Sequence, residues 1–116
     1  MVEKRLTDLF KVLAHPARLQ MLRMFGEDEV CVCQFMAVLN KRQAYVSQQM
    51  SVLREAGLVD VSKSGRNNFY RLVDPRVLDV VKAAADYLGV ELPEVDVPDI
   101  AEVSACVCTV PSTTQK

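Results

Sequence analysis

The chain has 116 residues, of which 50% are hydrophobic and 25% are charged, and its net charge is −1 at pH 7. This length suits one domain with a modest core, and the ordinary globular composition excludes a molecule that is basic over its whole surface. Because no signal peptide and no apolar run long enough to span a bilayer are visible, we expect a cytoplasmic protein without a membrane partner.

Three amphipathic helices are predicted in the first third of the chain. The first covers residues 1–14, with apolar residues at i, i+3, i+4 and i+7 from Leu6. Pro16 opens a second helix over residues 16–25, since proline is tolerated in the first helical turn. The third helix, over residues 32–39, repeats the apolar spacing of the first.

A fourth helix over residues 44–56 follows a short polar turn, and it is the stretch around which the chain is organised. Val46, Met50 and Leu53 recur at i, i+4 and i+7, which predicts one buried face. We expect the other faces to be exposed and rich in hydrogen-bonding groups, carried by Tyr45, Ser47, Gln48, Gln49, Ser51 and Arg54. Amides can read base edges, and hydroxyl and guanidinium groups can hold phosphates, so this pattern indicates a helix that reads DNA.

Two short strands and a fifth helix complete the predicted fold. Val59 and Val61 alternate with polar residues, and the turn SGRNN supplies Gly and Asn for positive φ, which predicts a β-hairpin. The fifth helix runs from Pro75 to about residue 88, with one apolar stripe formed by Val77, Val81, Ala84 and Leu88. The fold is therefore expected to be mainly α with a small β-hairpin, in the order α-α-α-α-β-β-α of a winged helix-turn-helix.

Charge is distributed unevenly along the chain. Residues 41–71 carry six Lys and Arg against two Asp and Glu, a local charge of +4, whereas residues 86–104 carry six acidic residues and no basic one. A basic patch can bind phosphate even when the total charge is near zero. The alternative is that these are two ordinary solvated surfaces of opposite sign.

The segments FKVLAHPARLQMLRMF, CVCQF and VSQQMSVLREAGLVDVSKSGRNNFYRL resemble the ArsR/SmtB family of bacterial metal-responsive repressors, most closely its arsenic-sensing members. The resemblance covers roughly residues 6–88. It implies a homodimer built through the first and last helices, with two reading helices in successive major grooves of a palindromic operator. It also implies repression without ligand and release of DNA when a toxic ion binds. No cofactor is expected for DNA binding.

The resemblance assigns DNA contacts to individual positions. On the fourth helix these positions are Ser47, Gln48, Gln49 and Arg54, and at the tip of the hairpin they are Lys63, Arg66 and Asn67. Gln49 departs from the family, in which many members carry His at that position. Tyr45 either stacks on the sugar-phosphate backbone or caps the helix against the turn. We expect residues 1–90 to form the DNA-binding and dimerisation domain and residues 91–116 an acidic, cysteine-bearing tail.

Two Cys-x-Cys pairs are the candidate inducer site, namely Cys31 with Cys33 and Cys106 with Cys108. Residues i and i+2 point about 200° apart in a helix but lie on the same side of an extended chain. Both sulfurs of the first pair can therefore bind one ion only if the start of the third helix is unwound. The arsenic-sensing relatives carry a third cysteine soon after such a pair, which is absent from this chain.

Thiolates select soft ions. Arsenic or antimony in the trivalent state takes three sulfurs, so Cys106 or Cys108 is expected to supply the third, within one subunit or from its partner. All four thiols together could instead hold cadmium, lead or zinc. The family's zinc site on the last helix is discounted, because only Asp79 and Asp86 lie there, without a histidine. A further alternative is a repressor in which oxidants or sulfane sulfur link one cysteine of each pair.

An enzyme is not expected. The single histidine, His15, has no visible nucleophile or orienting partner and is interpreted as a structural residue at a helix boundary. A thiol reductase would need a CxxC motif or an active-site base, neither of which is present. A pure interaction module is the remaining alternative, and it would bind no double-stranded DNA.

Overall fold

Five helices and three short strands follow one another within residues 1–26, 29–64 and 67–99, the part of the chain that the computed structural model describes. The elements are α1 (Val2–Leu13), α2 (Pro16–Arg23), β1 (Val30–Cys31), α3 (Val32–Leu39), α4 (Gln43–Glu55), β2 (Val59–Ser64), β3 (Asn67–Leu72) and α5 (Val77–Leu88). The predicted order of helices and hairpin is confirmed, and β1 is an addition to it.

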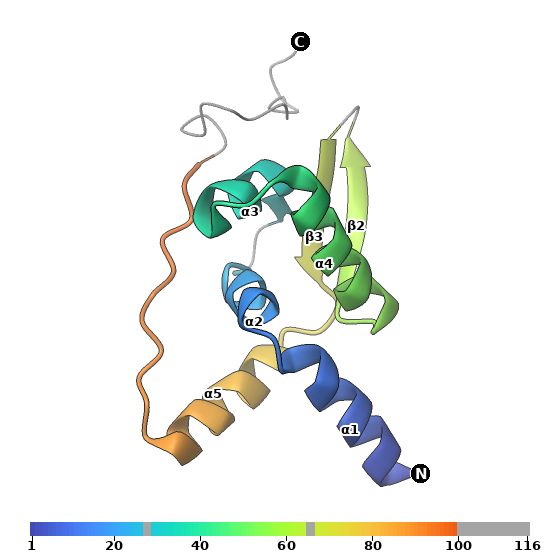
Figure 1. Cartoon of the computed structure of the whole chain (residues 1–116), viewed down its shortest axis with the longest axis vertical. Coiled ribbons are helices and arrows are strands. Elements are labelled where there is room, and N and C mark those ends of the chain that lie inside the picture. The colour runs from blue at the N-terminus through green and yellow to red at the C-terminus, as the bar shows by residue number, and fades with distance from the viewer. Residues whose placement is uncertain (27–28, 65–66, 100–116) are drawn as a thin grey trace.

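The core lies where α2, α3 and α4 meet the sheet (Figure 1). Its fully buried side chains come from all four, and include Met21, Leu22, Cys31, Phe35, Val46, Met50 and Leu53. The ring of Phe35 lies between those of Phe25 and Tyr70, with centroids 5.5 and 6.3 Å away. Helix α2 ends at Arg23, whereas the sequence predicted its end at residue 25. Phe25 belongs to the apolar pattern because its side chain is buried in the core, although it lies beyond the end of the helix.

The sheet is antiparallel with the strand order β1-β3-β2. The predicted hairpin pairs Val59 with Leu72 at one end and Ser64 with Asn67 at the other. The unpredicted strand β1 pairs Cys31 with Phe69 on the other edge of β3. A strand of two residues has no periodicity to detect, and its pairing depends on residues almost forty positions away.

The apolar stripe predicted for α5 is partly wrong. The buried residues are Val77, Val81 and Ala85, at i, i+4 and i+8, whereas Ala84 is exposed and Leu88 is 69% exposed. Helix α5 contacts α2. The C-terminal part of the predicted stripe, Ala84 and Leu88, is left uncovered within the described part of the chain.

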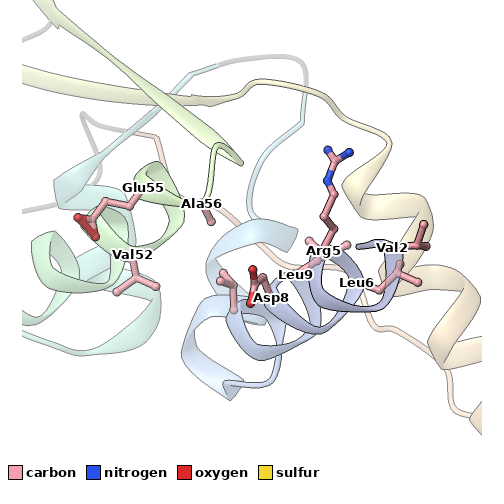
Figure 2. Close-up of a pocket in the computed structure, with 9 residues that line it drawn as sticks. Val2, Arg5, Leu6, Asp8, Leu9, Val52, Glu55 and Ala56 are labelled. Atoms are coloured by element: carbon pink, nitrogen blue, oxygen red, sulfur yellow. The ribbon is translucent and has the colours of Figure 1, made fainter.

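A similar apolar surface lies on α1. Leu6 and Phe10 are about half exposed, although Leu13 at the end of the same stripe is buried. An open groove of about 860 Å³ separates α1 from the end of α4 (Figure 2), and its wall includes Leu6, Leu9 and Val52. The α1 and α5 helices lie at the end of the molecule away from the hairpin tip (Figure 1). This end therefore presents apolar surface suited to a second protein surface.

After α5 the chain reverses and follows the body of the molecule. Gly89 caps α5 in the left-handed region, with φ 72° and ψ 23°. Residues 90–99, which we call the strap, then run without secondary structure from the end of α5 past α2 to α3 (Figure 1). Among the helices of residues 1–26, 29–64 and 67–99, none has the length and hydropathy needed to cross a membrane.

Candidate nucleic-acid interface and thiol site

A tight turn joins α3 to α4 in a helix-turn-helix arrangement. Asn40 ends α3 in the left-handed conformation, with φ 54° and ψ 48°, which asparagine tolerates better than most residues. Arg42 is extended at the N-cap of α4, and α4 ends before Gly57, whose φ of 80° confirms the predicted glycine stop. The predicted buried face of α4 is also confirmed, since Val46, Met50 and Leu53 are fully buried.

The outer face of α4 carries most of the predicted polar groups. Gln48 and Arg54 are exposed, while Ser47 and Tyr45 are half-buried. The ammonium nitrogen of Lys41 lies 5.3 Å from the centroid of the Tyr45 ring, within the range of a cation–π contact. This contact supports the interpretation that Tyr45 packs against the turn, and it places the positive charge of Lys41 at the start of α4.

The expectation that Gln49 is exposed is wrong. Its side chain is 9% exposed, and its amide oxygen accepts a hydrogen bond from Arg18 Nε at 3.0 Å. Arg18 Nη1 also donates to the carbonyl of Val12 at 3.1 Å, so one guanidinium ties the end of α1, α2 and α4 together. Val46, Gln49, Met50 and Leu53 follow the spacing i, i+3, i+4 and i+7, which placed Gln49 on the buried face. Its polarity, taken as a sign of exposure, was the misleading signal.

The hairpin forms the wing beside α4, which packs against β2. Lys63 is exposed near its tip, the backbone of Asn67 pairs with Ser64, and Arg66 lies outside the described residues. Asp60 and Arg71 face each other across the strands, with 3.2 Å between the carboxylate and guanidinium. A hydrogen bond from the Val61 backbone N–H and a second from Arg71 lower the pKa of Asp60. The charge of Arg71 is therefore partly balanced within the wing.

Cys31 and Cys33 fall on either side of the start of α3. Cys31 is extended, with φ −86° and ψ 153°, and is the N-cap, whereas Cys33 lies in the first helical turn. The two side chains are 0% and 2% exposed, and both sulfurs are disulfide-bonded. Cys106 and Cys108 lie outside the described residues. The boundary between extended chain and helix thus falls inside the Cys-x-Cys motif, as the predicted start at Val32 requires.

A capping box holds this boundary. The Cys31 backbone N–H donates to Gln34 Oε1 at 2.8 Å, and the Gln34 backbone N–H donates to the sulfur of Cys31. Gln34 therefore holds the start of α3, a contact that sequence reasoning missed, although a glutamine three positions after an N-cap was the available signal. Among the described residues, no group of three or more His, Cys, Asp or Glu side chains could hold a metal ion.

His15 occupies a helix boundary, as expected. It is the extended N-cap of α2, with φ −152° and ψ 119°, and its carbonyl accepts a hydrogen bond from Leu19 N–H at 3.0 Å. Its Nδ1 atom is buried without a hydrogen-bond partner in the described structure. These contacts are consistent with the structural interpretation of this residue.

Comparison with known proteins identifies similar regulators. Residues 15–61 match the family described as bacterial regulatory protein, arsR family. The chain is 41% identical over 85 residues to a biofilm growth-associated repressor of Agrobacterium fabrum, covering 71% of this chain and 73% of that protein. It is 33% identical over 85 residues to a transcriptional repressor SmtB homolog of Synechocystis, covering 73% and 64%.

A solved structure extends the similarity to the fold. The crystal structure of the transcriptional repressor BigR from Xylella fastidiosa matches with a TM-score of 0.66 and 31% sequence identity. The match covers 78% of this chain and 95% of the other.

We predict that the two neighbouring glutamines of α4 differ in their effect on stability. Replacing Gln49 by Ala leaves the partly buried Arg18 without its side-chain acceptor, so the free energy of unfolding should fall by about 1–3 kcal/mol. Replacing the exposed Gln48 by Ala should change it by less than about 0.5 kcal/mol. Urea unfolding at one protein concentration measures both, and equal small effects would contradict the structural role of Gln49.

Proposed function

The chain belongs to the arsR family of bacterial regulatory proteins, and on that premise we propose that this repressor releases its operator when trivalent arsenic or antimony binds its cysteine thiolates. The observation that carries the proposal is the position of Cys31. It caps α3, the helix that a short turn connects to α4. A ligand bound at this sulfur acts on the support of the reading helix.

The DNA-binding surface that we propose joins the outer face of α4 to the wing. Gln48 and Ser47 would contact base edges or phosphates, and Arg54 and Lys63 would contact phosphates, because these groups lie on exposed or half-buried positions of adjacent elements. The family resemblance adds DNA contacts by Arg66 and Asn67 to this proposal; Arg66 lies outside the described residues. Gln49 acts indirectly, by holding α4 through Arg18.

The coupling follows from the geometry of the Cys-x-Cys motif. Cys31 is extended and Cys33 is helical, so bringing both sulfurs onto one ion favours a changed first turn of α3. Since α3 packs against α4, this change would tilt or free the reading helix. A ligand that favours the changed state shifts the repressor away from DNA, and DNA weakens the ligand to the same extent.

Cysteine thiolates suit a soft ion that takes more than two sulfur ligands. A trivalent arsenic or antimony centre binds three sulfurs, so Cys106 or Cys108 would complete a site that Cys31 and Cys33 begin. The described residues alone supply no three-ligand cluster, which is why the tail is required. Cadmium, lead or zinc, held by all four thiolates, are alternative inducers with the same coupling.

A homodimer is part of the proposal. The uncovered apolar faces of α1 and α5, together with the groove beside α1 (Figure 2), offer surface that a second copy can cover. Two reading helices related by a two-fold axis match a palindromic operator.

A second candidate keeps the repressor and changes the inducer. Both Cys31 and Cys33 are disulfide-bonded in the structure, so the site can exist in an oxidised form. Oxidation of two thiols to a disulfide transfers two electrons and releases two protons, and an oxidant or a sulfane-sulfur donor would accept those electrons. In this form the repressor would respond to oxidants or reactive sulfur.

We predict that Arg54→Ala and Arg66→Ala weaken binding to an operator fragment selected from random duplexes. Each variant of the proposed homodimer loses two phosphate contacts, one per subunit, with their released counterions, so the slope of log K against log salt should decrease in magnitude by about 2. Fluorescence anisotropy at several salt concentrations measures the slope. Arg76→Ala is the control, because this exposed residue pairs with Asp74 before α5 and should leave the slope unchanged. Unchanged slopes in both test variants would contradict the assignment of the DNA-binding surface.

We predict that the double variant Cys31→Ser, Cys33→Ser binds the operator normally and is no longer released by arsenite. Serine is a good N-cap, so α3 should still begin at residue 32, while the soft-ion ligands are lost. An arsenite titration of the reduced protein on its operator measures release, with Cys106→Ser, Cys108→Ser as the matched variant. If the Cys31→Ser, Cys33→Ser variant is released at the same arsenite concentrations as the wild type, the sensing site lies outside α3.

Persulfide treatment distinguishes the two candidate inducers. For an arsenite sensor, we expect release by arsenite with no added sulfur in the denatured protein, since a bound metalloid contributes no sulfur atom to the cysteines. For a sulfur sensor, a polysulfide bridge between the two Cys-x-Cys pairs would retain extra sulfur. Mass spectrometry of peptides after persulfide and after arsenite treatment, paired with operator binding, decides between them.

A further inference from the structure

The side chain of Gln34 makes two hydrogen bonds, and no sequence motif predicts the second of them. Its Oε1 accepts the Cys31 backbone N–H, and its Nε2 donates to the carbonyl of Pro98 in the strap, both at 2.8 Å. Gln34 is 9% exposed; its bond with the Cys31 N–H is buried, and its bond with Pro98 is partly buried. One amide therefore joins the start of α3 to a segment 64 positions later in the chain.

We propose that Gln34 is a positioning residue that couples the path of the C-terminal strap to the start of α3, and so to the inducer site at Cys31. The proposal rests on the proposed function for its regulatory consequence. Its structural part, the control of the strap by Gln34, stands on the contacts alone.

The chemistry of the side chain distinguishes glutamine from glutamate at this position. Glutamate also accepts the N-cap N–H in a capping box, and near a helix N-terminus its charge is favourable. An ionised glutamate, however, cannot donate to the carbonyl of Pro98. Proline itself has no backbone N–H, so the strap offers an acceptor here and requires a donor from α3. Of glutamine and ionised glutamate, only the glutamine amide satisfies both partners at once.

The strap is anchored at a second point on α2. The guanidinium of Arg23 donates to the carbonyl of Pro93, and between the two anchors Val95 and Val97 pack against the core. The segment between Pro93 and Pro98 is thus held along α2, and its end lies at α3 (Figure 1).

The anchored position of Pro98 is the point from which the chain continues to the tail cysteines. Cys106 follows Pro98 by eight residues, and an extended chain of that length covers at most about 29 Å. Anchoring Pro98 beside the capping box raises the effective concentration of the tail thiols near Cys31. When an inducer alters the first turn of α3, Gln34 moves with it, so strap and inducer site respond together.

The test uses the reduced, full-length protein and two variants. Gln34→Glu keeps the bond to the Cys31 N–H and removes the bond to Pro98, whereas Gln34→Met, of similar size, removes both. The first readout is cleavage after Glu94 by a glutamate-specific protease, and the second is hydrogen exchange of the Cys31 amide. We expect cleavage to become about three- to tenfold faster in both variants, and the Cys31 amide to exchange faster only in Gln34→Met.

A third readout tests the coupling. The arsenite concentration for half-release of the operator should rise about three- to tenfold in Gln34→Glu. Unchanged cleavage after Glu94 in both variants would overturn the structural part. Faster cleavage with an unchanged arsenite concentration would overturn the coupling. Failure of arsenite to release the wild-type protein would overturn the proposed function, while the cleavage and exchange readouts still decide whether Gln34 holds the strap.

Discussion

The start of α3 is the point on which the rest of the structure depends. Cys31 is paired with Phe69 across the sheet and bonded to Gln34 in the capping box, so the sheet and the helix share one residue. One turn later, Phe35 is fully buried against Phe25 and Tyr70. A change in the backbone at Cys31 must therefore move either the sheet or the core contacts of α3.

Helix α4, the proposed reading helix, is held from two directions. The left-handed Asn40 makes the turn from α3 to α4 short, so little flexible chain separates the two helices. From the other side, Arg18 fixes Gln49 on α4 and the last turn of α1. The orientation of α4 thus depends both on the thiol site and on the helix whose apolar face is left uncovered. This arrangement is what the proposed antagonism between inducer and DNA requires.

The strap closes a path from α5 back to α3. It leaves α5 at Gly89, contacts α2 at Arg23 and ends its described course at the capping box. The proposed subunit face, the proposed inducer site and the proposed reading helix are therefore linked by contiguous contacts within one small chain. Under the proposed function, a soft ion would need to bias only one local transition, the first turn of α3, to affect DNA binding.

The amino-acid sequence by itself determined the five helices, the hairpin and the family, because apolar spacing and turn residues are local signals that survive without knowledge of packing. It also located Cys31 and Cys33 at the start of α3. Only the tertiary structure decided that β1 exists, that Gln49 is buried by Arg18, and that Gln34 reaches Pro98. Each of these depends on a partner more than thirty residues away, and spacing within one helix specifies a face but not what will cover it.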